Sequence, residues 1–538
     1  MKKMIGGSSD ESHRPVFLRS RRRWAGIALA AGMIATGSPV AAQVTKAEKL
    51  SQSSTATNSG FGFGARALGM GGAFIAIADD ASAASWNPAG IGQLTRPEIT
   101  IVGSSSTTSV AASPEDQLWE AANAKGVKSG AIDRLHFTGW DATSRSSGID
   151  FASYVQPFTI GSTTVSAQLS YARVLTAGSS SHSNSLVWTD NYYANPPAEV
   201  LYSQSNIHSE SSGSGAIDTY TLGFATALLN QKLFVGASAT LWRGEIGSVS
   251  YDTEATTYYE YKELVPGQGV QAIPTSTYLW EVTETERRKV NGLSGSFGVL
   301  ALPLPWLRVG AVYRTGWSGS GTAQGTYYRL LNSTEGRSTR QGATSFDSKV
   351  EWPSSYGFGI AVQPVSTLTV SFDYTGSDWR KGRTDKTVAS WTTYTDGSAT
   401  PNYGEASFPA TGLPAGWQNN QNAVRVGAEY VLRAGKALIP IRAGYYSITA
   451  MAPLFGGTYD TDPKMRFNGI TGGVGISLDL GGERSLLFDL AIVSEEAESS
   501  YSASQQFFPD GDTSTYYSDQ WSQKVRNSRL IGSLVYRF

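Results

Sequence analysis

The chain has 538 residues, of which 40% are hydrophobic, 11% aromatic and 16% charged, with a formal net charge of −1 and no cysteine. Charged residues make up about a quarter of an ordinary soluble chain, so the ionic content is low. Without a broad basic excess, a nucleic-acid partner has no electrostatic support. The lack of cysteine suits export, because nothing can then cross-link wrongly in an oxidising periplasm.

Residues 1–42 have the order of a secretory signal peptide. Arg21, Arg22 and Arg23 precede an apolar stretch from Trp24 to Thr36, and small residues end the segment at Ala42, where we expect cleavage. The apolar stretch is shorter than the roughly 18 residues that suggest a transmembrane helix, although an N-terminal anchor left in place is the alternative. The remaining chain has no apolar run that could span a bilayer as a helix, which leaves a periplasmic protein, a secreted protein or a membrane barrel.

Strand-length segments with a period of two fill the chain from about residue 97 to its end. In one of them, Val424, Val426 and Ala428 alternate with Arg425 and Gly427. One face of each segment is therefore apolar and the other is polar or glycine. A soluble β-sandwich alternates in the same way, so the connections between strands must decide the fold class.

The predicted connections alternate strictly between short and long. Short turns are predicted at Gln156-Pro157, Asn230-Gln231, Pro303-Leu304-Pro305, Gln363-Pro364, Ala434-Gly435 and Gly481-Gly482, each rich in turn-forming residues. Short periplasmic turns, long outer loops and an even strand number are typical of an outer-membrane barrel. The sequence therefore predicts an all-β fold, a transmembrane antiparallel β-barrel of about 14 strands over residues 97–538, with both termini in the periplasm.

The C-terminus supports this fold. Leu530, Leu534, Tyr536 and Phe538 share one face of the last predicted strand, and the chain ends at Phe538. A terminal aromatic residue after an alternating strand resembles the signal that the outer-membrane assembly machinery reads. We therefore expect Tyr536 and Phe538 to form that signal, and the assembly machinery and outer-membrane lipids to be partners.

Glycine and alanine dominate residues 43–96, which show no strand alternation. The segment contains Arg66-Ala67 in a glycine-rich stretch, then Ala78-Asp79-Asp80-Ala81 and Asn87-Pro88-Ala89. In these motifs the segment resembles the N-terminal hatch of outer-membrane transporters of the FadL type and their TodX-like hydrocarbon-channel relatives. Weaker similarity follows at residues 425–430 and 442–445.

The resemblance implies a 14-stranded barrel with the hatch, residues 43–96, inside the lumen as a plug. It also implies a hatch and gating set, which comprises Arg66, Asp79, Asp80, Asn87, Pro88 and Ala89. A small hydrophobic ligand would land on outer loops near 251–287 and 321–345, enter a lumen pocket beside the hatch and leave sideways through a gap in the third strand. The sequence departs from that pattern in one respect, because residues 162–176 contain no glycine. A glycine there would make the kink that opens such a gap easier to form.

A plug has a physical purpose, because a barrel of this size is wide enough to leak. Small residues let the plug backbone lie against the wall, and Pro88 fixes a bend. The hatch charges are expected to pair with inward-facing polar residues, which are Arg425, Glu429, Arg442 and Asp489. The alternative is that all of these are solvated lumen charges without specific partners.

No pattern of catalytic or metal-binding residues is evident. His136, His182 and His208 fall in predicted outer loops without metal-ligand spacing or a visible Ser-His-acid group, and the glycines around Phe63 follow no strand and begin no βαβ unit. We therefore expect no enzyme, no cofactor and no metal. The leading hypothesis is a channel for passive uptake of a small hydrophobic molecule, such as a long-chain fatty acid or a hydrocarbon. The alternatives are a structural or secretion-accessory surface barrel and a barrel-embedded lipase or protease.

Overall fold

Antiparallel strands dominate the computed structural model. It describes residues 62–114, 118–122, 132–137, 140–161, 163–176, 180–192, 200–262, 271–333, 336–378, 387–395, 402–408, 420–435, 437–449, 466–507 and 515–538. The predicted signal peptide, residues 1–42, and the first part of the predicted hatch lie outside the described residues.

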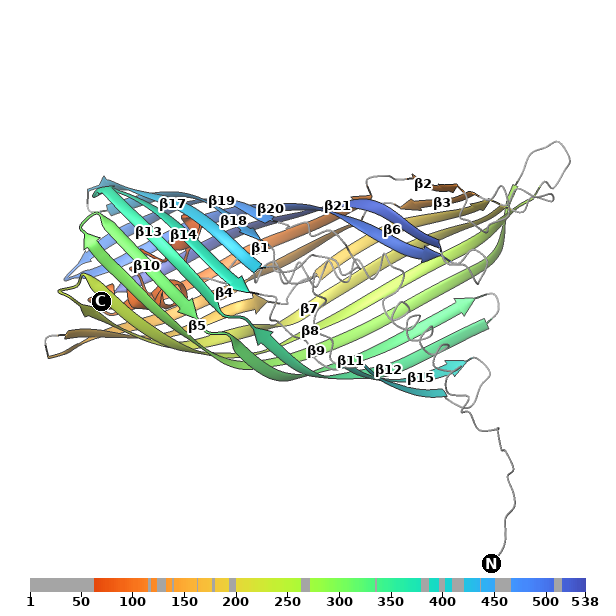
Figure 1. The fold of residues 1–538 in the computed structure, drawn as a ribbon, viewed down its shortest axis with the longest axis horizontal. Helices are drawn as coiled ribbons and strands as arrows, with labels where there is room; N and C mark the ends of the chain where they lie inside the picture. The colour runs from red at the N-terminus through yellow and green to blue at the C-terminus, as the bar shows by residue number, and fades with distance from the viewer. Residues whose placement is uncertain are drawn as a thin grey trace, which may run out of the picture.

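Fourteen of the strands form a closed ring, which confirms the predicted barrel (Figure 1). In ring order they are β1 (Glu98–Pro114), β4 (Trp140–Ile160), β5 (Thr163–Thr176), β7 (Val200–Leu228), β8 (Leu233–Lys262), β9 (Gln271–Leu304), β10 (Leu307–Arg314), β13 (Ser355–Val365), β14 (Leu368–Asp378), β17 (Asn420–Ala434), β18 (Ala437–Thr449), β19 (Arg466–Gly481), β20 (Arg484–Phe507) and β21 (Thr515–Arg537). The ring closes where β1 pairs with β21 along its whole length, from Glu98 opposite Arg537 to Pro114 opposite Trp521.

The other strands extend the sheet beyond one end of the ring. They are β2 (Leu118–Ala122), β3 (Ile132–Phe137), β6 (Ser180–Tyr192), β11 (Trp317–Ser333), β12 (Gly336–Trp352), β15 (Thr387–Thr395) and β16 (Asn402–Phe408). The segments 251–287 and 321–345 were expected to be outer loops, but most of their described length is strand, because β8 pairs with β9 out to Lys262 and β11 pairs with β12 throughout. Their role as a landing surface for a ligand stays a prediction. Figure 1 shows these strands as long ribbons at the end opposite the C-terminus.

The six short turns join successive ring strands at the end where the C-terminus lies, which we call the short-turn end (Figure 1). Two of the predicted positions were wrong, and the larger displacement is in β4, which continues through Gln156 and Pro157 and turns at Gly161 instead. Pairing of β4 with β1 stops at Val155, so Pro157 has a strand partner on one side only. A missing N–H is tolerated at such an edge. Pro364 likewise lies within β13, close to its end.

Apolar side chains cover the outside of the barrel. Ile470 is 70% exposed, Leu293 67% and Ile492 59%, whereas polar neighbours such as Thr471 are buried inside. A closed barrel satisfies every backbone hydrogen bond within its ring, so an apolar exterior of this kind is suited to lipid rather than to water. The last two aromatic residues, Tyr536 and Phe538, pack edge to face with ring centroids 4.8 Å apart. Their role as an assembly signal stays a prediction.

Residues 62–96 lie inside the ring, and we call them the hatch. They contain three short helical turns, α3 (Ala65–Gly69), α4 (Ala83–Trp86) and η1 (Pro88–Gln93), drawn in red and orange in Figure 1. Hydrogen bonds join the hatch to strands all around the wall. The wall residues include Ser533 of β21, Thr471 of β19, Asp373 of β14, Val299 of β9 and Ser153 of β4. No helix among the residues described has the length and apolar character that a membrane crossing requires.

Glycines of the wall let the hatch backbone lie directly against the strands. A Cβ atom at any of five of them would overlap hatch atoms, and these are Gly236, Gly298, Gly310, Gly427 and Gly444. They lie on β8, β9, β10, β17 and β18, so the close contact surrounds the hatch. Tight packing therefore depends on small residues in the wall as well as in the hatch.

Candidate functional site

A buried ionic network fixes one side of the hatch to the wall. Arg66 of α3 donates two hydrogen bonds to Glu429 of β17, each 2.9 Å long, and a third of 2.5 Å to Asp79. Arg442 of β18 donates to Glu429 and to Asp489 of β20, both at 2.6 Å. Arg66, Glu429, Arg442 and Asp489 are therefore paired with one another, and are not solvated lumen charges without partners.

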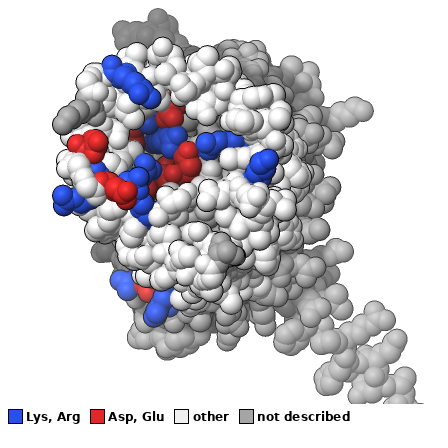
Figure 2. Space-filling view, turned by 90° about the vertical axis from the view of Figure 1, so that its left-hand side faces the viewer, with Lys and Arg blue, Asp and Glu red and all other residues white. Residues whose placement is uncertain are grey.

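The network reaches the mouth of the barrel at the short-turn end. Arg308 of β10 lies 3.5 Å from Asp79, and Glu98 of β1 accepts a 2.6 Å hydrogen bond from Arg537. Figure 2 shows basic and acidic side chains gathered in a hollow at this end, within a surface that is largely uncharged. Asp79 therefore lies between two arginines, Arg66 of the hatch and Arg308 of the wall.

Asp80 plays a different part from Asp79. Its Oδ1 accepts hydrogen bonds from the backbone N–H of Ser82 at 2.9 Å and from the Ser82 hydroxyl at 2.5 Å, which fixes the turn before α4. Burial raises the pKa of the Asp80 carboxyl above its ordinary value, and Arg66 with the Ser82 hydrogen bonds offsets only part of that rise. Burial also opposes the charge on Arg66, yet Asp79 and Glu429 outweigh it and hold the pKa of that guanidinium well above its ordinary value.

Asn87, Pro88 and Ala89 form one structural unit. Asn87 is fully buried and caps η1 by accepting from the N–H of Ala89 at 3.1 Å, and Pro88 occupies the first turn. The Asn87 amide also donates to the carbonyls of Ile75 at 3.0 Å and Val299 at 3.1 Å. A single amide thus connects two parts of the hatch to strand β9.

Arg425, the fourth predicted lumen residue, contacts strand β14 and the hatch. Its Nη1 donates to Thr375 of β14 at 2.8 Å, and its side chain lies against Gly72 of the hatch. Asp373 is not among the site residues expected from the sequence, and its Oδ2 accepts hydrogen bonds from the N–H groups of Phe74 and Ile75 at 2.7 and 2.8 Å. Asp373 is fully buried, and it ties the centre of the hatch to β14.

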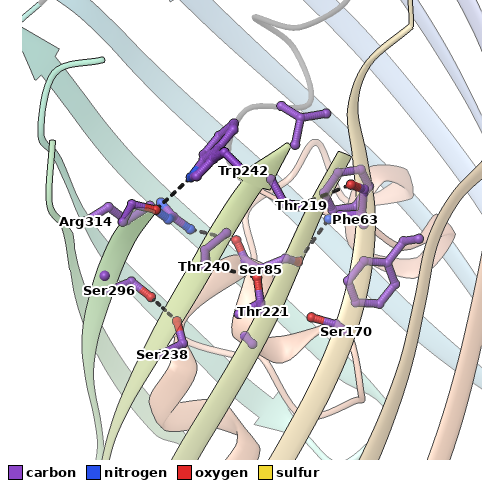
Figure 3. Close-up of a pocket in the computed structure, with 17 residues that line it drawn as sticks. Phe63, Ser85, Ser170, Thr219, Thr221, Ser238, Thr240, Trp242, Ser296 and Arg314 are labelled. Carbon is purple, nitrogen blue, oxygen red and sulfur yellow. Dashed lines mark hydrogen bonds between the residues drawn. The ribbon is translucent and has the colours of Figure 1, made fainter. Parts of the chain in front are cut away.

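A cavity of about 110 Å³ lies on the other side of the hatch, between α4 and the strands β4 to β10 (Figure 3). Hatch residues Phe63, Ala84 and Ser85 line it from one side. Wall hydroxyls line it from the other, and these are Ser170, Thr219, Thr221, Ser238, Thr240, Ser294 and Ser296. This cavity lies beside the hatch, where the resemblance implies a lumen pocket.

Aromatic rings bound this cavity on different sides. Phe63 stacks on Phe151 of β4 with ring centroids 5.4 Å apart, and Trp242 of β8 stacks on Trp317 of β11 at 4.8 Å. Trp352 of β12 completes a cluster with both tryptophans. Figure 3 shows Phe63 and Trp242 on different sides of the hydroxyl-lined space. A planar apolar molecule can therefore meet aromatic surface at more than one face.

The third ring strand, β5, is continuous where a gap for lateral exit was expected. It pairs with β4 from Thr163 to Ala172 and with β7 from Val165 to Thr176. The ladder with β7 has one irregularity, a register shift between Arg173 and Leu175, and Val174 between them lines the cavity. Lateral exit therefore requires local movement of a strand that is paired in this structure.

The three histidines outside the predicted signal peptide lie on three different strands. His136 lies in β3 and His182 in β6, whereas His208 in β7 lies 3.3 Å from the exposed Glu210. The described part of the chain contains no group of three or more His, Cys, Asp or Glu residues that could hold a metal ion.

No protein-family model matches the chain, and no curated protein matches it. Solved structures similar to this chain include the Pseudomonas putida toluene transporter TodX, at 14% identity and a TM-score of 0.45 over 89% of this chain and 99% of that one. A Pseudomonas aeruginosa FadL homologue is similar at 11% identity and a TM-score of 0.45, over 88% of this chain and 98% of that one. The Ralstonia pickettii toluene transporter TbuX is similar at 15% identity and a TM-score of 0.37, over 89% of this chain and 98% of that one.

Proposed function

We propose that this protein is an outer-membrane channel for passive uptake of a small, largely apolar molecule, with the hatch as its gate. The observation that carries the proposal is the cavity beside the hatch, which is bounded by the aromatic rings of Phe63, Phe151 and Trp242 inside a barrel with an apolar exterior. Binding sites for small molecules are concave and mainly apolar, with a few placed polar groups.

The size of the cavity favours a small ligand. A dry apolar cavity of about 150 Å³ admits benzene, so a space of about 110 Å³ is on the scale of one ring. A long-chain fatty acid would occupy it with only part of its chain. The proposed cargo is therefore a compact hydrophobic molecule, and the hatch and gating residues act by closing the lumen beneath it.

Uptake into vesicles tests this function. The full-length mature protein is placed in vesicles whose outer leaflet is lipopolysaccharide, and the initial uptake rates of radiolabelled toluene and oleate are compared with those of protein-free vesicles. We expect faster entry of toluene with the protein. Thr240→Trp should fill the cavity and return that rate towards the protein-free value.

The matched control is Ala239→Trp, because Ala239 is the neighbouring residue on β8 and its exposed side chain lies on the opposite face of the strand. This variant should keep the wild-type rate. Equal rates for both labelled compounds in protein-containing and protein-free vesicles would overturn the uptake function and favour a structural or secretion-accessory barrel.

A further inference from the structure

The hydroxyl groups of the cavity wall occur as cross-strand pairs. Thr221 of β7 and Thr240 of β8 are 2.9 Å apart, and Ser238 of β8 and Ser296 of β9 are 2.6 Å apart. A hydroxyl has one proton to donate and two lone pairs, so the bond within a pair uses only one of its two protons. Each pair therefore keeps a second proton and further lone pairs for another partner.

An apolar ligand in this cavity would displace water from these hydroxyls and supply no hydrogen bond in return. Such a loss weakens binding, because polar groups taken out of water without a partner carry a free-energy penalty. Eight of the seventeen lining residues are serine or threonine. A cavity intended for pure hydrocarbon would present alanine, valine or leucine at several of these positions, so the lining points to a ligand with a polar atom.

A further hydroxyl of the cavity lining orients Trp242. The indole N–H of Trp242 donates to Ser294 at 2.8 Å, and this bond holds the indole in a defined orientation at the cavity, backed by the stacked ring of Trp317. Ser294 accepts in that bond and keeps its own proton. A ring surface and an available hydroxyl donor thus lie side by side.

The polar groups of the lining also indicate which polar atom the ligand would carry. Arg314 is the one ionisable side chain among the residues described as lining the cavity, and its guanidinium donates to the hatch carbonyls of Ser85 at 2.7 Å and Trp86 at 3.0 Å. Together with the wall hydroxyls, this guanidinium gives the cavity a lining rich in N–H and O–H donors, which favours an oxygen on the ligand and disfavours an ammonium group.

From this combination we propose that the compound taken up is a single-ring aromatic molecule with an oxygen substituent, of the phenol type, rather than an unsubstituted hydrocarbon. The ring lies among Phe63, Phe151 and Trp242, and the oxygen exchanges hydrogen bonds with the paired hydroxyls of β7, β8 and β9. This inference rests on the proposed function, because it names the class of compound that the channel would carry.

Fluorine NMR titrations of the full-length mature protein in nanodiscs test the inference, with empty nanodiscs as the blank. The probes are 4-fluorophenol and 4-fluorotoluene, which differ in a hydroxyl against a methyl group. We expect 4-fluorophenol to bind roughly ten-fold more tightly, since one satisfied hydrogen-bonding group is worth about that factor. The double variant Thr221→Val, Thr240→Val keeps the shape of the wall and should reduce this preference to near parity.

The matched control is Thr226→Val, which changes another threonine of β7. The Thr226 hydroxyl donates to the Thr164 carbonyl, and Thr226 does not line the cavity. It should keep the wild-type preference. Binding of 4-fluorotoluene as tight as, or tighter than, that of 4-fluorophenol to the wild type would overturn the phenol inference and leave the uptake function standing. Binding of neither probe above the blank would overturn both.

Discussion

The two sides of the barrel wall hold the same hatch by different means. Strands β14 and β17 present carboxylates to it, Asp373 and Glu429, and the ion pairs that Arg442 of β18 makes with Glu429 and with Asp489 of β20 lie behind this contact. Strands β4 to β9 present hydroxyls, an amide, backbone carbonyls and glycine, and the cavity lies on this side. Apart from Arg314 of β10, whose guanidinium bonds two hatch carbonyls, the residues that line the cavity are uncharged, and we call this side the neutral side. A largely apolar ligand can therefore bind here without disturbing the ion pairs of Glu429.

The contrast also explains how the hatch can be both fixed and open to a ligand. Buried ion pairs are directional, and loss of one partner leaves an uncompensated charge, so they set the position of the hatch. Hydroxyl contacts can instead be exchanged with water or with a ligand at little cost. We infer that opening of the hatch begins on the neutral side, while the pairs around Arg66 keep the segment attached.

The largest effect is expected on the charged side. Glu429→Gln removes the carboxylate shared by Arg66 and Arg442, and breaking a buried pair of this kind costs about 3–5 kcal/mol. The midpoint of heat-induced unfolding, followed by gel mobility of unheated and heated samples, should fall clearly. The control is Glu496→Gln, which breaks pairs with Lys524 and Arg526 at a site where Glu496 is 48% exposed.

The control should change little, because ion pairs between exposed side chains contribute little to stability. If Glu429→Gln and Glu496→Gln proved equally mild, the ionic side would not be what positions the hatch.

A smaller effect is expected on the neutral side. Asn87→Ala removes three hydrogen bonds and leaves the carbonyls of Ile75 and Val299 without that partner, at a cost of about 1–3 kcal/mol for a buried group left unsatisfied. The hatch should loosen, and cells or vesicles with this variant should admit small antibiotics or dyes faster than wild type.

The control for Asn87→Ala is Asn468→Ala, which removes an exposed amide that accepts from Tyr445 on the outside of the barrel. It should leave permeability unchanged. Wild-type permeability in Asn87→Ala would count against a gating role for Asn87, Pro88 and Ala89.

The smallest effect concerns Asp80, whose pKa is raised above 3.8 by burial. A raised pKa in the folded state means that protonation favours the fold, so the stabilisation is present below the unfolded value and is lost as pH rises through the folded value. Asp80→Asn should therefore match or slightly exceed wild-type stability at neutral pH, and the difference should shrink on acidification. A wild-type protein that becomes relatively more stable than Asp80→Asn as pH rises would contradict this sign.

The strand pattern predicted the barrel because lipid-facing alternation is a local property, visible in segments such as 424–428 and 470–478. The turn near Gln156-Pro157 was misplaced because a proline is tolerated where β4 has lost its β1 neighbour, which only the ring register reveals. The extended ribbons of β8, β9, β11 and β12 were taken for loops because polar residues occupy both of their faces, which removes the period-two signal.

At the site, the motifs located Arg66, Asp79 and Asn87, and the alternation located Glu429, Arg442 and Asp489. Their specific pairs could not be predicted, because partners lie on strands that are far apart in sequence. The resemblance implied a pocket beside the hatch, but its lining could not be predicted for the same reason, since Phe63 meets Phe151, and Trp242 meets Trp317, only in the closed ring. Serine and threonine at alternate positions of β7, β8 and β9 were the available signal, and they match an ordinary polar lumen.

The location of a bound ligand tests the central claim most directly. Crystals of the protein soaked with 4-bromophenol would give an anomalous bromine peak in diffraction data collected at the bromine edge. The account predicts a bromine peak inside the cavity between Phe63 and Trp242, at the end of the ring that points away from the paired hydroxyls of Thr221 and Thr240. A lumen peak among Arg66, Glu429 and Arg442, with the cavity empty, would contradict it.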